Sequence, residues 1–100
     1  MNKYLPLLLL LCSCVSYSGN SIASHTVTSD IMKYIKLFEM SQNCNKIQAV
    51  HREPYSSNSE KQEYEELWTV TACGQKNKYY VSMKPDGMSG TLFNIGSSGK

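Results

Sequence analysis

Apolar and polar positions along this chain follow two different periods, one helical and one strand-like. The helical period runs over residues 29–42, where apolar side chains recur at three- and four-residue steps. The stripe consists of Ile31, Tyr34, Ile35 and Phe38. This spacing predicts an amphipathic helix whose apolar stripe packs against a sheet. Ser29 or Asp30 is expected to cap the start of the helix.

Strand-like patterns follow the helix. They predict strands over residues 46–53, 64–73, 79–83 and 90–95. The second pattern is the strongest, because Trp68, Val70 and Ala72 alternate with threonines, as in a strand with one buried face. Polar or turn-forming residues separate the strands, at residues 54–62, 74–77 and 85–87. Pro54 is expected to end the first strand, since proline has no N–H for a sheet ladder.

The order of these elements predicts an α+β domain, in which one N-terminal amphipathic helix packs on a four-stranded antiparallel sheet. Short connections between consecutive strands imply antiparallel pairing, and a single helix covers one face of such a sheet. We expect the domain to span residues 29–96 and to end in a short tail, residues 97–100. Residues 14–28 are rich in Ser, Thr, Asn and Gly, which predicts a flexible tether.

Residues 1–13 have the order of a secretory signal peptide. Lys3 supplies a positive N-terminal region, a leucine-rich run follows, and small residues stand just before Cys14. The apolar run is too short to span a bilayer, which takes roughly 20 residues. We therefore predict that the chain is exported.

Two cleavage sites fit this leader. Leu11-Cys12-Ser13-Cys14 resembles the lipobox of bacterial lipoproteins. That resemblance implies that Cys14 becomes the first mature residue and carries the lipid. Val15 after the cysteine resembles the pattern of outer-membrane lipoproteins. The alternative is cleavage after Ala23, which gives a soluble periplasmic or secreted protein.

Cys44 and Cys73 form an even pair in a chain predicted to be exported, where disulfides are the default. A bridge between them would close a loop of about 30 residues and contribute roughly 3–4 kcal/mol on the loop-entropy model. No Cys-x-x-Cys motif and no His partners at ligand spacing are present. A structural disulfide is therefore predicted, rather than a metal or redox site.

Charge and side-chain chemistry predict neither nucleic-acid binding nor catalysis. The net charge is +2, and it falls to +1 without Lys3, too little for a basic nucleic-acid patch. His25 lies in the predicted tether, and His51 has no partner suited to a catalytic triad. The carboxylates between residues 60 and 66 lack an evident cleft. We predict no catalytic, cofactor-binding or metal-binding residue, and therefore a protein that is not an enzyme.

Several short segments carry a family resemblance. They are Cys44 with Ile47 and Val50, Glu66-Leu67-Trp68-Thr69-Val70-Thr71-Ala72-Cys73-Gly74, Tyr80-Val81, Pro85-Asp86-Gly87 and Gly90-Thr91-Leu92-Phe93. With these residues, about half the chain resembles small uncharacterised bacterial lipoproteins that share a disulfide-linked β domain. The resemblance implies an exported, membrane-anchored domain and transfers no catalytic residues.

These observations together predict a non-enzymatic cell-envelope lipoprotein whose domain binds a protein or surface partner. Its acyl chains would hold it in the lipid bilayer, facing the periplasm, and the expected location is the outer membrane. The alternative is a secreted or periplasmic inhibitor of a hydrolase such as lysozyme. In that case the loop at residues 54–62 would enter the hydrolase's active site.

Overall fold

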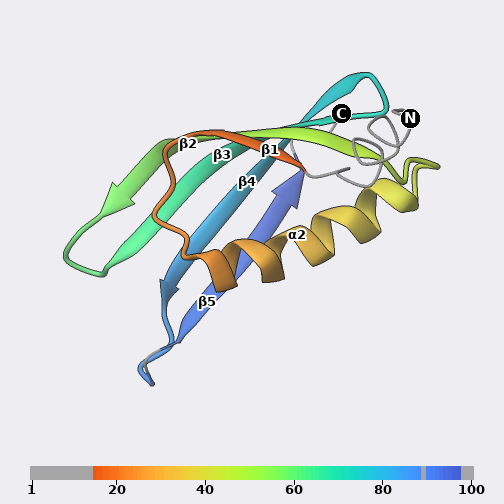
Figure 1. Ribbon diagram of the computed structural model, residues 1–100. Coiled ribbons are helices and arrows are strands. Elements are labelled where there is room, and N and C mark those ends of the chain that lie inside the picture. Colours follow the sequence, from red (N-terminus) through yellow and green to blue (C-terminus); the bar gives the residue numbers. More distant parts are fainter. Residues whose placement is uncertain (1–14, 89, 98–100) are drawn as a thin grey trace, which may run out of the picture.

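The computed structural model describes residues 15–88 and 90–97. Cys14 and the predicted leader lie outside these residues. Within the described part, the chain forms one helix and five strands (Figure 1). In order they are β1 (Ser16–Gly19), α2 (His25–Met40), β2 (Ile47–Asn58), β3 (Glu63–Ala72), β4 (Gln75–Pro85) and β5 (Thr91–Ser97).

The strands form one mixed sheet in the order β1-β2-β3-β4-β5. Strands β2 to β5 are a run of antiparallel neighbours, whereas β1 pairs with β2 in parallel. The α+β architecture is confirmed. The prediction of four antiparallel strands behind an N-terminal helix is wrong, because β1 precedes the helix and adds a parallel edge. Every residue of β1 is exposed, so no apolar alternation marks this strand in the sequence.

Gly19 ends β1 and turns the chain toward the helix. Its φ of 82° lies in the left-handed region, which favours glycine. A Cβ atom at Gly19 would lie 1.9 Å from the carbonyl oxygen of Arg52, and the next residue, Asn20, donates its N–H to that oxygen at 2.9 Å. Residues 15–28 thus hold a strand and the first turn of α2, and the predicted tether is corrected accordingly.

Helix α2 begins four residues before the expected start at residue 29. Ser24 is the N-cap, and its Oγ accepts a hydrogen bond from the N–H of Val27 at 3.1 Å. The predicted caps, Ser29 and Asp30, lie inside the helix. Asn43 follows the helix with a φ of 66°, a conformation that commonly ends helices.

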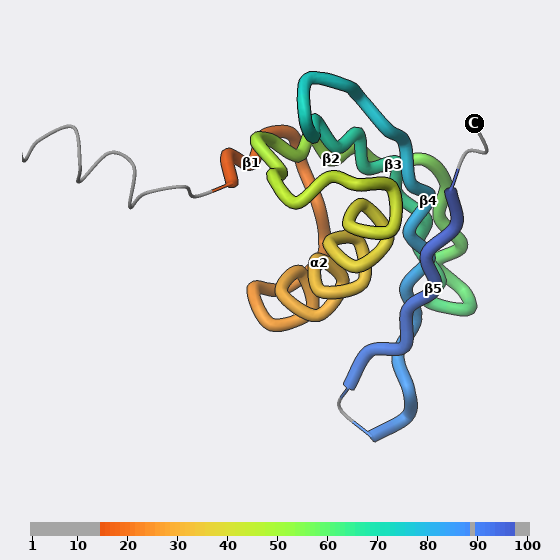
Figure 2. Tube along the Cα trace, turned by 90° about the vertical axis from the view of Figure 1, so that its right-hand side faces the viewer, coloured from red at the N-terminus to blue at the C-terminus, as the bar shows by residue number. Residues whose placement is uncertain are grey.

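The core lies between α2 and one face of the sheet, which bends around the helix (Figure 2). Its buried residues are Ile31, Met32, Ile35, Cys44, Val50, Trp68, Val70, Ala72, Tyr79, Val81 and Met83. The predicted helix stripe is only half correct. Ile31 and Ile35 are buried, but Tyr34 is 58% exposed and Phe38 is 42% exposed. Met32 and Glu39 take the buried positions instead.

Two connections differ from their predictions. Pro54 does not end β2, because β1 pairs only as far as Arg52 and Pro54 lies on the open edge beyond it. The register shifts between Pro54 and Ser56, and the turn to β3 is confined to residues 59–62.

The turn predicted at residues 74–77 is shorter in the structure. Cys73 and Gly74 alone, both with positive φ, close the β3–β4 hairpin, so residues 75–78 belong to β4.

The β4–β5 turn falls where Pro85-Asp86-Gly87 predicted it. Asp86 Oδ1 accepts hydrogen bonds from the N–H groups of Met88 at 2.7 Å and Gly90 at 2.9 Å. These bonds lower the pKa of Asp86 below its ordinary value of 3.8, because they stabilise the carboxylate. The turn thereby fixes where β5 begins.

Candidate functional site: the groove between α2 and β5

An open groove of about 700 Å³ runs between α2 and β5. Helix α2 contributes Tyr34, Leu37 and Phe38 to its walls, and β5 contributes Leu92, Phe93 and Ile95. The groove exists because α2 stops short of covering the outer strand. Phe93 and Ile95 pack only partly against the core, and the aromatic flank of the helix stays in solvent.

Two aromatic pairs connect the helix to the sheet along this groove. Tyr34 packs edge-to-face on Phe93 with ring centroids 5.9 Å apart. Phe38 does the same on Tyr79 of β4, with centroids 5.8 Å apart. Such pairs hold their rings in defined orientations. The walls of the groove are therefore preformed rather than assembled when a ligand arrives.

The groove lining is apolar and carries no formal charge among the described residues. Its polar members are Ser41, Thr91, Asn94 and Ser97. Leu37, 62% exposed, and Leu92, 51% exposed, stand at the rim. Solvent-exposed apolar side chains gathered in one groove are typical of a binding site. An uncharged apolar ligand suits this lining best.

Strand β5 adds a second binding element. It is the last strand in the sheet order, so the outer edge of its residues 91–96 pairs with no other strand of residues 15–88 and 90–97. Alternate residues of an edge strand direct their N–H and C=O groups away from the sheet. An apolar groove and an open strand edge thus lie side by side.

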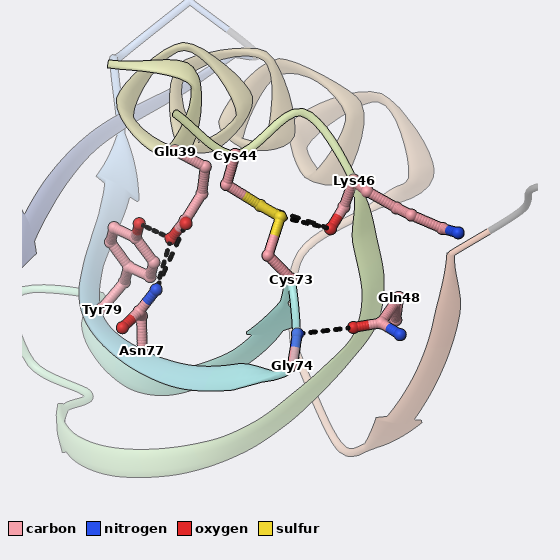
Figure 3. The surroundings of a disulfide bond; sticks show 8 residues. All are labelled: Glu39, Cys44, Lys46, Gln48, Cys73, Gly74, Asn77 and Tyr79. Atoms are coloured by element: carbon pink, nitrogen blue, oxygen red, sulfur yellow. Dashed lines mark hydrogen bonds between the residues drawn. A yellow bond between two sulfur atoms is a disulfide. The ribbon is translucent and has the colours of Figure 1, made fainter. Parts of the chain in front are cut away.

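Buried Glu39 fastens the end of α2 to β4 (Figure 3). Its carboxylate accepts hydrogen bonds from the Tyr79 hydroxyl and from Asn77 Nδ2, the latter at 3.0 Å and 3.2 Å to the two oxygens. Burial raises the pKa of Tyr79 well above its ordinary value, and the hydrogen bond to Glu39 and that residue's charge raise it further. The contacts of Glu39 with Tyr79 and Asn77 thus form a polar anchor between α2 and β4.

The predicted Cys44–Cys73 disulfide is present and lies beside this anchor, where it joins the segment after α2 to the β3–β4 turn (Figure 3). The main-chain N–H of Cys44 also donates to the carbonyl of Glu39 at 3.0 Å. The bridge and the carboxylate fasten the same end of the helix. Lipidation at Cys14 falls outside the described residues.

A second buried carboxylate, Glu66, fastens the chain at the other end of the helix. It accepts hydrogen bonds from Ser21 Oγ at 2.6 Å, Ile22 N–H at 2.7 Å and Trp68 Nε1 at 2.8 Å. Glu65 points to the opposite face of β3 and contacts Ser56 and Ser82. The acidic residues near position 65 are therefore divided between the two faces of the sheet, and Glu66 has a structural role.

The two histidines do not come together. His25 is exposed at the first residue of α2. His51 is exposed on β2, where its ring contacts Ser18 Oγ at 2.9 Å and Glu53 at 3.7 Å. No group of three or more His, Cys, Asp or Glu side chains with metal-binding geometry occurs within the described residues.

Comparisons of the chain with protein-family models, curated proteins and solved structures find no match. Among the described residues, no helix has the length and apolar character needed to cross a membrane.

The sequence pattern missed the groove because it assigned Tyr34 and Phe38 to the core. One signal was available: the predicted stripe is flanked by Leu37, so the apolar surface of the helix is wider than one core-facing stripe requires.

Proposed function

We propose that this domain is a non-enzymatic binding domain that receives an extended segment of another protein in the α2–β5 groove. The observation that carries the proposal is the coincidence of an open apolar groove with the outer edge of residues 91–96 of β5, which pairs with no other described strand. A segment that pairs with β5 gains main-chain hydrogen bonds, and its alternate side chains enter the groove.

The chemistry of the lining supports binding rather than catalysis. The described residues that line the groove include no His, Cys, Asp, Glu, Lys or Arg. Such a lining offers no general base and no activated nucleophile. The same absence of charge favours a partner segment with uncharged apolar residues at alternate positions.

The proposed location is the cell envelope, with the chain anchored by lipid at Cys14. The leader pattern supports export. The Cys44–Cys73 disulfide also supports it, because such bridges persist in oxidising compartments. An envelope or surface protein is therefore the class of partner proposed.

Tyr34 and Tyr55 provide a matched pair for testing the groove. Both are tyrosines, both are 58% exposed, and each packs edge-to-face on one aromatic ring, Phe93 and Tyr80 respectively. Tyr34 lines the groove, whereas Tyr55 packs on the sheet face opposite the helix. In the full chain, each tyrosine is replaced in turn by the photo-reactive residue p-benzoylphenylalanine. The variants are expressed in the cells that naturally produce the protein.

Irradiation is expected to crosslink the Tyr34 position, but not the Tyr55 position, to one partner protein. Mass spectrometry should locate the crosslink in a single extended segment of that partner. Leu37→Arg should abolish this crosslink, because the arginine would place a charge in the apolar groove. Equal crosslinking from both positions would contradict the proposal. A product made of two copies of this chain would assign the groove to self-association instead.

A second candidate function is inhibition of a hydrolase. Residues 54–62, which the sequence pattern predicts to be a loop, belong to the β2–β3 hairpin. Residues 53–63 are all exposed, and the turn of the hairpin is confined to residues 59–62. A projecting exposed hairpin favours insertion into a cleft. Its test is a lysozyme inhibition assay, in which Glu60→Ala with Lys61→Ala should weaken inhibition; no inhibition by the unchanged protein rejects this candidate.

A further inference from the structure

Charged side chains are segregated along the sheet. Exposed lysines gather at the end where α2 finishes and β2 and β4 begin, namely Lys36, Lys46, Lys76 and Lys78. Carboxylates gather at the opposite end, around the β2–β3 and β4–β5 turns, namely Glu60, Glu63, Glu65 and Asp86. Lys61 and Lys84 are the cations at the acidic end. Glu39, the one acid at the lysine end among the described residues, is buried and hydrogen-bonded.

The described chain begins at the lysine end. Val15 lines a small pocket together with Lys36, Met40 and Lys46, and we name these four residues the anchor-side patch. Met40 is 56% exposed. Because β1 begins at Ser16, only Val15 separates Cys14 from the sheet. A lipid attached to Cys14 would therefore join the domain beside this patch.

Strand β1 is held firmly to the rest of the domain. It pairs with β2 in register from Ser16 opposite Ala49 to Gly19 opposite Arg52. The Arg52 guanidinium lies 5.0 Å from the ring centroid of Tyr17 and 5.4 Å from that of Trp68, a cation–π arrangement that links β1 to the core. The patch thus keeps a fixed position relative to Ser16, the first residue of β1.

We infer that the anchor-side patch lies against the headgroups of an anionic phospholipid bilayer and orients the domain on it. The inference rests on the proposed anchor at Cys14. Each lysine close to an anionic membrane surface strengthens binding roughly fivefold. The acidic end is repelled from the same surface. The α2–β5 groove lies on the other flank of the helix, so it stays open to a partner.

The test uses the chain as it would stand after removal of the predicted leader, residues 14–100 carrying Cys14→Ser, which cannot be acylated at that position, with vesicles of phosphatidylcholine alone or mixed with phosphatidylglycerol. The variant pair is Lys36→Gln with Lys46→Gln. The control pair is Lys61→Gln with Lys84→Gln, which removes the same charge from the acidic end. All four lysines are exposed, so folding should be preserved, and the thermal unfolding midpoints check that it is.

The expected result is tighter binding to the phosphatidylglycerol vesicles, which falls by at least about tenfold in the patch variant and stays within about twofold in the control. High salt should remove the preference. Equal binding to both vesicle compositions, or equal losses in the two variants, would overturn the inference. Because no acyl group is attached, this result is independent of the tests of lipidation and of the groove.

Discussion

The Tyr79 hydroxyl donates a hydrogen bond to the carboxylate of Glu39, and this bond joins the last turn of α2 to the middle of β4. The ring of the same tyrosine lines the groove and packs on Phe38. One side chain thus connects the polar anchor of the helix to the wall of the proposed binding site. This contact holds α2 against β4, the strand that pairs with β5.

Tyr79→Phe should lower the free energy of unfolding by about 1–3 kcal/mol, because a buried hydrogen bond to a charged group is lost while the ring is retained. The loss should shrink as the pH rises above about 10. The direction of this pH dependence follows from the raised pKa of Tyr79 in the folded state. The stabilisation by the Tyr79 hydroxyl is fully present below the ordinary tyrosine pKa of 10.0. It declines at higher pH, because the unfolded chain releases the phenolic proton before the folded chain does.

Urea unfolding of both proteins between about pH 8 and pH 11 measures this difference. Tyr55→Phe serves as the control, because that residue is exposed and packs on the other sheet face. A stability difference for Tyr79→Phe that does not change over this range would show that the hydroxyl is not held by Glu39 in the folded protein.

Gly19→Ala should destabilise the protein more than Gly74→Ala does. Both glycines have positive φ, 82° and 78°, so both substitutions cost roughly 1 kcal/mol or more of backbone strain. Only at Gly19 would the new Cβ meet the Arg52 carbonyl oxygen, at 1.9 Å, while Gly74 faces open space. We expect Gly19→Ala to cost at least about 2 kcal/mol and to release β1 from β2.

Chemical denaturation of the two variants compares these costs, and hydrogen exchange of the β2 amides reports the release of β1. Equal costs at the two positions would show that β1 is not packed as closely on Arg52 as the structure indicates.

Removing the disulfide with Cys44→Ala and Cys73→Ala should lower the free energy of unfolding by about 3–4 kcal/mol, from the entropy of the closed loop. The cysteines are 29 residues apart. Glu39 should still hold the helix end in the folded state, so the circular dichroism of the folded variant should be nearly unchanged. A loss below about 1 kcal/mol would mean that the bridge hardly constrains the unfolded chain.

The intact mass of the protein taken from membranes tests the proposed lipid anchor at Cys14. We expect a chain that begins at Cys14 and carries acyl chains. Without reduction, its mass should be lower by the hydrogens that are lost when the Cys44–Cys73 bridge forms. A product that begins at Ser24 without lipid would reject the anchor. It would also remove β1, since cleavage after Ala23 separates Ser16–Gly19 from the domain.

Much of the fold could be predicted from local patterns. The alternation of Trp68, Val70 and Ala72 fixes the buried face of β3, and all three are buried as expected. Ile31 and Ile35 place the helix on the sheet. These predictions succeeded because burial is repeated with the period of the element, so a few neighbouring residues contain the information.

The remaining features depend on contacts distant in sequence. Every residue of strand β1 is exposed, and the strand owes its place to pairing with β2 and to the contact of Tyr17 with Arg52. Glu39 is buried because Tyr79 and Asn77 supply donors from another strand, whereas a charged residue in a sequence pattern counts as exposed. Placing Glu39 in the core turns Tyr34 and Phe38 outward, and the groove follows from that rotation.

The central claim is that an extended partner segment pairs with the edge of β5 beside the α2 flank. Hydrogen exchange of the full chain, with and without the segment identified by crosslinking at Tyr34, tests it most directly. The account predicts slower exchange at alternate amides between Thr91 and Gly96, with no change at the other sheet edge, β1. Protection at β1, or no protection along β5, would contradict it.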